Sequence, residues 1–445
     1  MSGPRRSILL AVTAGVLLAP AAAPASAPSD PLLDQQWALA ADGPLGAPAA
    51  WSRTTGAGAV VAVLDTGADM THPDLQGALW TNPGEVPGNG VDDDGDGWVD
   101  DVHGIDLVNH DSDPSDDEGH GTHVAGIIAA RAGDDEGGAG LAPGAQVMLV
   151  KVLDDHRAGT ASNLAKGIEY ALARGARILN TSVNGDDTSV ELRAALAAAT
   201  AAGATVVASA GNDGRDIDAA PSYPASYPDL SLLTVAAEGE GGALAPFSNR
   251  GLAAVDVAAP GENILSTANG GGYELRSGTS MAAPFASATL ALMASARPDL
   301  PGPALRAALL ASARRTSLLG GLLGAGALDA AGAVAAILGP LPPALAPTAR
   351  AAVRASSSTI AIRALKTGRR AKGATLRWFV SGNRAAVANV RVTLDGRTIA
   401  KRKPSARSRL VVKARPGRHR YGVVLLDAHG RKLAALSGAF RVARR

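Results

Sequence analysis

The chain contains no cysteine. Disulfide bonds, thiolate nucleophiles and cysteine-ligated metal centres are therefore excluded, and an exported form would need another way to stabilise its loops. Aromatic residues are also scarce, at 3% of the chain, whereas glycine occurs 53 times. We expect a core of closely packed small side chains, and 445 residues suffice for two or three domains.

Acidic residues are nearly missing from the C-terminal part of the chain. From residue 348 onward, 25 Lys and Arg residues stand against Asp395 and Asp427 alone, although the whole chain carries a net charge of only +1. The sequence therefore predicts an acidic body with a basic tail domain, residues 352–445. The Pro- and Ala-rich residues 339–351 are typical of a stiff linker between the two.

The N-terminus carries an apolar run of moderate length. Arg5-Arg6 precedes apolar residues 8–18, and small residues follow as far as Ala25-Ser26-Ala27. This pattern predicts a cleaved signal peptide, residues 1–27. The alternative is a membrane anchor, but the run is short for a membrane span, and no later transmembrane segment is expected. We therefore expect a secreted protein, extracellular or associated with the cell envelope.

Between residues 28 and 338, strand-like apolar runs alternate with helical patterns. This alternation predicts an α/β domain with a parallel sheet and helices on both of its faces. The expected strands are residues 59–64, 147–153, 176–182, 204–209, 231–236 and 253–261, and the expected helices include residues 161–174 and 190–202. From residue 352, short β runs between turns predict a small all-β, sandwich-like domain.

Three reactive residues lie at the ends of expected elements. Asp65 follows the strand at 59–64, His120 opens a helix, and Ser280 lies in a glycine-bearing turn before a helix at 285–296. Parallel sheets form sites at the carboxyl ends of their strands, and helix N-termini favour negative charge. Acyl transfer through a serine needs a base, an acid that orients it, and stabilisation of an oxyanion. Alone, Ser280 would equally suit a helix cap.

The segments around these residues resemble the three signature blocks of the subtilisin-like serine proteases. The blocks are Val63-Leu64-Asp65-Thr66-Gly67, His120-Gly121-Thr122-His123-Val124-Ala125-Gly126 and Gly278-Thr279-Ser280-Met281-Ala282-Ala283-Pro284. They occur in the order Asp, His, Ser, and the resemblance runs from about residue 30 to about residue 335. It implies a serine endopeptidase acting on proteins or peptides, with Ser280 as nucleophile, His120 as general base and Asp65 orienting the imidazole.

The resemblance also implies the groups that hold the substrate. Asn212 matches the asparagine that stabilises the oxyanion, although a turn residue is the alternative. A substrate peptide would pair as an added strand with Ser182, Val183, Asn184 and Gly185. Asn184 stands where the family usually has glycine, so its side chain could narrow the pocket for the residue before the scissile bond.

A long acidic loop, residues 82–118, contains the start of an EF-hand-like calcium pattern. Acids alternate at Asp92, Asp94 and Asp96, and Gly97 follows. His103 stands at the twelfth position, so Asp100 or Asp101 would have to replace the usual glutamate. So many like charges repel one another without a cation, which favours bound Ca²⁺ over a solvated acidic turn. The expected ligands are Asp92, Asp94, Asp96 and Asp101.

A second calcium site follows from the resemblance alone. Asp74 matches a family ligand, Asp135 lies in the loop that would complete the site, and Gln36 corresponds to an N-terminal ligand. Calcium would then stabilise loops that disulfides cannot. The mature enzyme is expected to begin near Asp30-Pro31, without the inhibitory domain that secreted members commonly carry before the catalytic domain.

Other classes of function fit the sequence less well. His120 and His123 could suggest zinc, but no H-E-x-x-H motif accompanies them. Asp65-Thr66-Gly67 is also an aspartic protease motif, but that enzyme needs two such triplets. A binding protein with an inactive protease-like body is a third alternative, against which the intact Asp, His and Ser set argues.

The basic tail has its own set of alternatives. Its charge suggests docking to an anionic cell-envelope polymer or to the acidic body, and a solvated spacer is the other interpretation. Nucleic acid is disfavoured because aromatic residues for stacking are nearly missing from the tail. A monomer is expected.

Overall fold

The computed structural model describes residues 30–339, apart from 228, 229 and 231, and seven strands between residues 361 and 442. The chain divides into two compact units, the first ending at Leu341 and the second beginning at Pro342. The predicted signal peptide, residues 1–27, and nearly all of the predicted linker, residues 339–351, lie outside the described residues.

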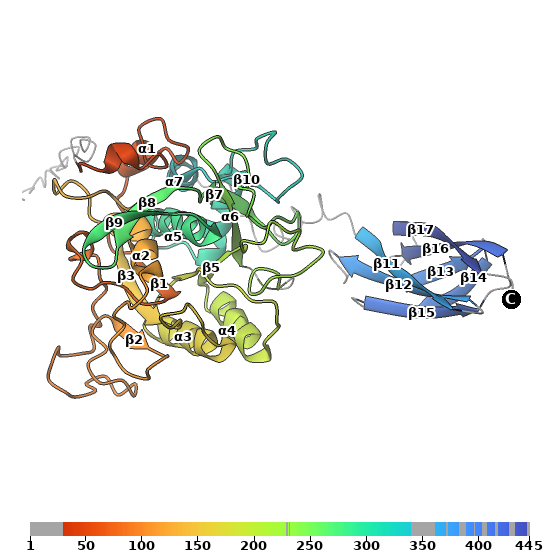
Figure 1. Ribbon diagram of the computed structural model, residues 1–445, viewed down its shortest axis with the longest axis horizontal. Helices are drawn as coiled ribbons and strands as arrows, with labels where there is room; N and C mark the ends of the chain where they lie inside the picture. Colours follow the sequence, from red (N-terminus) through yellow and green to blue (C-terminus); the bar gives the residue numbers. More distant parts are fainter. Residues whose placement is uncertain are drawn as a thin grey trace, which may run out of the picture. The chain divides into compact units, whose positions relative to one another are not determined.

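A parallel sheet forms the centre of the first unit (Figure 1). Its strand order is β10-β7-β6-β5-β4-β1-β3-β2, and neighbouring strands pair in parallel. The strands are β1 (Val60–Asp65), β2 (Gly104–Asp106), β3 (Gln146–Lys151), β4 (Ile178–Thr181), β5 (Thr205–Ser209), β6 (Leu233–Glu238), β7 (Val257–Pro260) and β10 (Gly326–Ala327).

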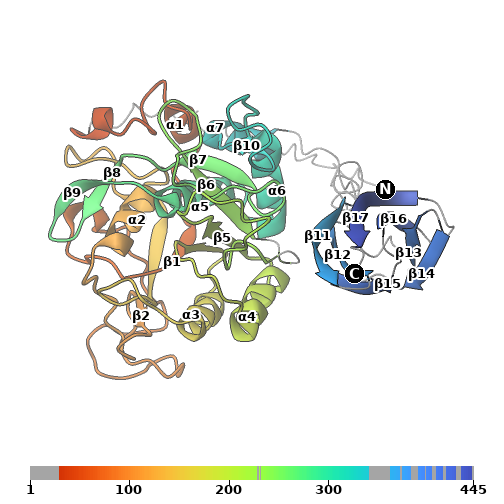
Figure 2. The same cartoon turned by 45° about the vertical axis from the view of Figure 1, so that its right-hand side comes forward.

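Helices cover both faces of this sheet. They are α1 (Ala47–Trp51), α2 (His120–Ala129), α3 (Ala161–Ala173), α4 (Val190–Ala201), α5 (Thr279–Ala296), α6 (Gly302–Ser312) and α7 (Ala330–Leu338). Figure 2 shows α3 and α4 side by side, as Figure 1 does. The predicted α/β class with helices on both faces is confirmed.

Strand β1 shows how the sequence sets the two faces. Alternate side chains of a strand point to opposite sides of the sheet. Val61 and Val63 join the hydrophobic core that contains α2 and α5. Ala62 and Leu64 join the core that contains α3 and α4. The continuous apolar run of β1 therefore reflects burial on both sides, as is typical of parallel sheets.

Helix α5, which carries Ser280, is buried along most of its length. Every residue from Thr279 to Met293 is buried. A helix that is apolar on all sides belongs in a core rather than on a surface. The sequence predicted helix from residue 285, whereas the helix begins at Thr279 and continues through Pro284. Ser280 therefore belongs to the first turn of the helix and not to a loop before it.

The chain segment between β7 and α5 was not predicted to form regular structure. It is an antiparallel hairpin of β8 (Ile264–Ala268) and β9 (Gly272–Arg276). Two 3₁₀ helices, Leu33–Gln35 and Pro73–Leu75, complete the elements of the first unit. None of the described helices combines the length and apolar character needed to span a bilayer.

The described strands of the second unit form two antiparallel sheets. One has the order β11-β12-β15 and the other β14-β13-β16-β17. Their bounds are β11 (Ala361–Arg370), β12 (Gly373–Ser381), β13 (Asn389–Leu394), β14 (Arg397–Arg402), β15 (Arg407–Lys413), β16 (Gly417–Leu426) and β17 (Lys432–Val442). The all-β, sandwich-like domain stays a prediction for this part of the chain.

Glu238, the last residue of β6, gives a prediction about stability. Its side chain is 2% exposed. Burial raises its pKa to about 7, and the charge of Arg314 offsets only part of this rise. Because the unfolded carboxyl titrates near 4.5, stability is lost as the pH rises from about 4.5 to about 7. Above that range the cost is about 3 kcal/mol.

We therefore expect Glu238→Gln to raise the free energy of unfolding by about 1–3 kcal/mol near pH 8, relative to its effect near pH 4. Urea unfolding measures this, in a Ser280→Ala background because the sequence predicts a protease. The exposed Glu240 supplies the control Glu240→Gln. An equal effect of Glu238→Gln at both pH values would contradict the raised pKa.

Candidate active site

Asp65 is the last residue of β1, which lies between β4 and β3 in the parallel sheet. Its side chain is fully buried. Oδ1 accepts the backbone N–H of Thr66 at 2.8 Å and lies 2.6 Å from Nδ1 of His120. Oδ2 is buried without a hydrogen-bond partner. Oδ1 of the carboxylate therefore binds the imidazole, and Oδ2 is buried away from water.

His120 is the first residue of α2, so the helix itself presents its imidazole. Its backbone N–H donates to Oε2 of Glu118 at 2.7 Å. Burial lowers the pKa of His120, but the charge and the hydrogen bond of Asp65 together raise it above the ordinary value. Since Nδ1 faces the carboxylate, its proton is held there and Nε2 is left as the basic atom.

The close approach of α2 to the turn after β1 depends on Gly121. A Cβ at this position would lie 2.1 Å from the carbonyl oxygen of Gly67, which is closer than real Cβ contacts. The N–H of Gly121 also donates to Oγ1 of Thr66 at 2.8 Å. A side chain at residue 121 would push the helix away and separate His120 from Asp65.

Ser280 is the second residue of α5 and is linked to Ser182 in both directions. Its Oγ donates to the Ser182 carbonyl at 3.2 Å, and the Ser182 hydroxyl donates to the Ser280 carbonyl at 3.0 Å. Pro284 has no N–H to offer that carbonyl at the helical i–4 position, which leaves it free for Ser182. Because its hydroxyl bonds to Ser182, Ser280 must release this carbonyl before it passes a proton to His120.

Asn212 follows β5 and faces the N-terminus of α5. Its Oδ1 accepts the backbone N–H of Thr279 at 2.8 Å and the Thr279 hydroxyl at 3.0 Å. Both contacts use the amide oxygen, so they fix which way the amide points. The Nδ2 donors of this exposed residue are then directed away from Thr279.

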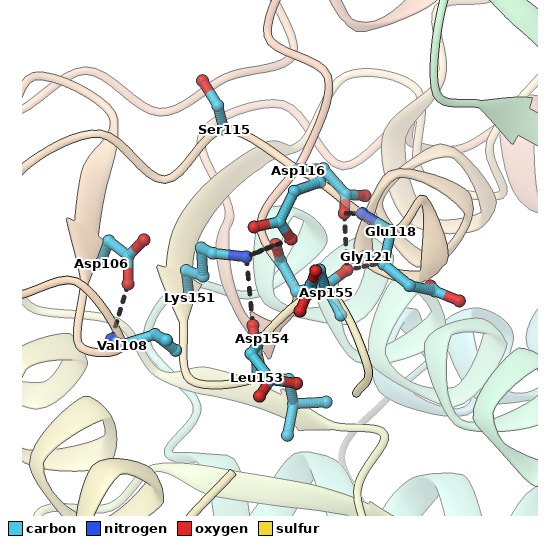
Figure 3. Close-up of polar contacts among 12 residues, drawn as sticks. Asp106, Val108, Ser115, Asp116, Glu118, Gly121, Lys151, Leu153, Asp154 and Asp155 are labelled. Atoms are coloured by element: carbon cyan, nitrogen blue, oxygen red, sulfur yellow. Dashed lines mark hydrogen bonds and ion pairs between the residues drawn. The ribbon is translucent and has the colours of Figure 1, made fainter. Parts of the chain in front are cut away.

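Asp116 organises the loop that precedes His120. Oδ1 accepts from the Thr66 hydroxyl at 2.8 Å and from the N–H groups of Glu118 and Gly119, while Oδ2 accepts from Thr122. Figure 3 shows Asp116 beside Glu118 and Gly121. Burial alone would raise the pKa of Asp116, but these hydrogen bonds lower it overall. The carboxylate thus ties the start of α2 to the turn after Asp65.

Lys151 (Figure 3), the last residue of β3, lies next to the turn that follows Asp65. It is 1% exposed, and Nζ donates to the Thr66 carbonyl at 2.8 Å and to the Leu153 carbonyl at 3.1 Å. It also forms an ion pair with Asp117 at 2.7 Å. Its buried charge is therefore compensated by two carbonyls and by the half-exposed carboxylate of Asp117, and the pair joins the strand to the loop before His120.

The predicted substrate segment continues from β4. Ser182 is buried, and Asn184 and Gly185 are exposed. Gly185 exchanges two backbone hydrogen bonds with Tyr223, at 2.8 and 2.7 Å. Val183 is half-buried and packs against the α3–α4 side of the core. The segment thus runs beside Ser280 with Asn184 at its exposed edge, and its role in substrate binding stays a prediction.

The residues of the acidic loop that were predicted to bind calcium contact several different partners. Asp94 and Asp96 both form ion pairs with Arg174. Asp101 is buried, and it accepts from the Tyr170 hydroxyl at 2.5 Å and from Asn82 at 2.7 Å. Glu85, Asp92 and Asp94 bring their carboxylate oxygens within 4.8 Å of one another. The sequence had not singled out Glu85, because it precedes the alternating acids.

Asp74, the predicted ligand of the second site, is buried in the 3₁₀ helix Pro73–Leu75. Oδ2 accepts the N–H of Gly138 at 3.2 Å, whereas Oδ1 is buried without a hydrogen-bond partner. Burial raises the pKa of this carboxyl. The loop with Asp135 lies next to it, and Gln36 Oε1 accepts from Ala139 at 2.8 Å. A buried oxygen without a donor is what a cation ligand requires, so Asp74 fits calcium, although among the described residues no cluster of three metal-binding groups includes Asp74 or Asp135.

The zinc alternative finds no support in the contacts of His123. Nε2 of His123 lies 3.0 Å from the Ile264 carbonyl and 3.1 Å from the Glu274 carbonyl. Burial lowers its pKa to about 3, so the ring is neutral. His120 is bound to Asp65 instead. Among the described residues, neither histidine belongs to a cluster of three metal-binding groups.

Comparisons with known proteins found a matching family and several similar proteins. A model described as the subtilase family matches residues 56–335. The thermophilic serine proteinase of Bacillus sp. strain AK1 is 40% identical over 247 residues, which are 55% of each chain. Thermitase of Thermoactinomyces vulgaris is 39% identical over 56% of this chain and 79% of its own. The chain thus spans about half of one relative and most of the other.

A solved structure gives the same result for the fold. A protease from Pseudoalteromonas arctica PAMC 21717 aligns with a TM-score of 0.59 and 32% identity, over 70% of this chain and all of that one. The family match ends at residue 335, before the basic region.

Proposed function

The chain belongs to the subtilase family of serine-type endopeptidases, and on this premise we propose that it cleaves proteins through Ser280, His120 and Asp65. The observation that carries the proposal is the 2.6 Å contact between Asp65 Oδ1 and His120 Nδ1. Such a pair can activate a nucleophile that meets the opposite ring nitrogen, and Ser280 lies in the first turn of α5, which packs on α2.

The proposed reaction starts when a substrate carbonyl reaches Ser280. The hydroxyl leaves the Ser182 carbonyl and gives its proton to Nε2 of His120 while Oγ attacks the carbonyl carbon. Asp65 stabilises the imidazolium that forms. His120 then protonates the leaving amine, which breaks the peptide bond and leaves an acyl-enzyme. Water hydrolyses this ester with His120 again acting as base.

The tetrahedral intermediate carries its negative charge on the former carbonyl oxygen. We assign Nδ2 of Asn212 and the backbone N–H of Ser280 as its donors. The two contacts from Thr279 to Asn212 Oδ1 support this, because they leave the donor end of the amide for the substrate. A donor oriented before the reaction costs no reorganisation when the charge develops.

Substitution of Asn212 tests this assignment. We expect Asn212→Ala to lower kcat on a peptide p-nitroanilide by about 10²–10³-fold with a small change in KM, because only the transition state carries the charge. Ser280→Ala defines the background activity of the assay and should not react with a fluorophosphonate probe. Asn163→Ala, which removes an asparagine on α3 that bonds to the Leu107 carbonyl, is the control. Equal kcat for Asn212→Ala and Asn163→Ala would overturn the assignment.

We further propose that calcium stabilises the catalytic unit at two places. One involves Asp74 with Asp135, and the other the acidic loop with Asp92, Asp94 and Asp96, to which Glu85 adds a carboxylate. Asp101 contributes there through the Asn82 and Tyr170 network. Bound cations would neutralise clustered carboxylates in a chain without disulfides. Calcium has no part in the proton transfers.

Removal of calcium should therefore lower stability. In a Ser280→Ala background, we expect a chelator to lower the free energy of unfolding by about 2–4 kcal/mol relative to saturating calcium. Asp74→Asn should lose part of this response, whereas the exposed Asp34→Asn should keep all of it. Unfolding curves that are identical with and without chelator would contradict both proposed sites.

The remaining proposals concern location and partners. The sequence of residues 1–27 supports secretion, and the excess of Lys and Arg after residue 347 supports docking of the second unit to an anionic cell-envelope polymer. We propose that the protein acts as a monomer. N-terminal sequencing and size-exclusion chromatography of exported protein, with salt elution from cell envelopes, test these points.

A further inference from the structure

Two chain segments flank the proposed nucleophile. Strands β4 and β5 are parallel neighbours, with Thr181 beside Ala208. The first segment is residues 182–185, which follow β4, and the second is residues 209–212, which begin with the last residue of β5. Ser280 bonds to Ser182 on the first segment, and Thr279 bonds to Asn212 on the second. A carbonyl held between Ser280 Oγ and Asn212 Nδ2 therefore places the side chain of its own residue over the gap between the two segments.

The side chain of Asn184 lies across this gap. Its Nδ2 donates to the backbone carbonyl of Ser209 at 2.8 Å. The hydroxyl of Ser209 donates back to Asn184 Oδ1 at 2.9 Å. Both ends of the amide are thus bound to one residue of the opposite segment. Ser209 is fully buried whereas Asn184 is exposed, so the amide reaches from the exposed edge of one segment to a buried residue of the other.

Further contacts lie along the same two segments. Gly185 is held by its two backbone hydrogen bonds to Tyr223. Asp186 forms an ion pair with Arg215, whose Nε also lies 3.4 Å from Asp213 on the other side. The segments are therefore joined by side chains at two points, Asn184 to Ser209 and Asp186 through Arg215 to Asp213.

We propose that the Asn184–Ser209 pair restricts the enzyme to substrates with a small side chain, Gly, Ala or Ser, on the residue before the scissile bond. This inference rests on the proposed function and names its substrate class. A large apolar side chain would have to break two hydrogen bonds and leave the buried Ser209 carbonyl unpaired. A site with buried polar groups discriminates strongly against ligands that cannot satisfy them.

The full-length enzyme and tetrapeptide p-nitroanilides that differ only in their last residue (Ala, Leu, Phe or Arg) provide the test. We expect wild-type kcat/KM for Ala to exceed that for Phe by about tenfold or more. Asn184→Gly should raise the Phe-to-Ala ratio of kcat/KM by at least about tenfold, and Ser209→Ala, which removes one of the two bonds, by less. Asn163→Ala should leave the ratio at its wild-type value.

Thermal unfolding checks that each variant is folded. If Asn184→Gly does not fold, Ser209→Ala still tests the inference. A wild-type preference for Leu, Phe or Arg would overturn the inference, as would a ratio that neither variant changes. In those cases a fluorophosphonate probe still labels Ser280, so the proposed function survives. Loss of both labelling and hydrolysis in the wild type would instead overturn the proposed function itself.

Discussion

The hydrogen bond between the buried carboxylate of Asp65 and Nδ1 of His120 is the interaction on which the site depends. The partners end β1 and begin α2, so they meet only because the helix packs directly on the turn after the strand. Gly121 makes that approach sterically possible. Asp116 then binds both the turn and the first residues of the helix. The geometry of one hydrogen bond is thus determined by backbone packing and by a second buried carboxylate.

Ser280, the proposed nucleophile, is held in a comparable way by the core. Helix α5 is buried on all sides along most of its length, so the position of its first turn is fixed by the sheet and by α2. Pro284 frees the Ser280 carbonyl from the helical ladder, and Ser182 takes it. Ser280 and His120 lie in the first turns of helices, and Asn212, the proposed oxyanion donor, follows a strand.

The sequence predicted the α/β class, Asp65 at the end of a strand and His120 at the start of a helix, because each depends on a local pattern at the end of an element. It placed Ser280 in a turn before a helix, whereas that helix begins at Thr279. It did not predict the hairpin at 264–276, whose strands are short and partly exposed. Glu85 was also missed, since only the fold brings it to Asp92. Likewise, the sequence marked Asn184 as unusual, but its bond to Ser209 depends on the pairing of β4 with β5, which a single sequence does not reveal.

The pH dependence of fluorophosphonate labelling at Ser280 tests the central claim most directly, because that reaction needs the same base and no leaving amine. The Asp65 pair raises the pKa of His120, so labelling should fall with a midpoint above 6.5 as the pH decreases. Asp65→Asn should label far more slowly and lose this midpoint. Labelling that is independent of pH, or equal in Asp65→Asn, would contradict the account.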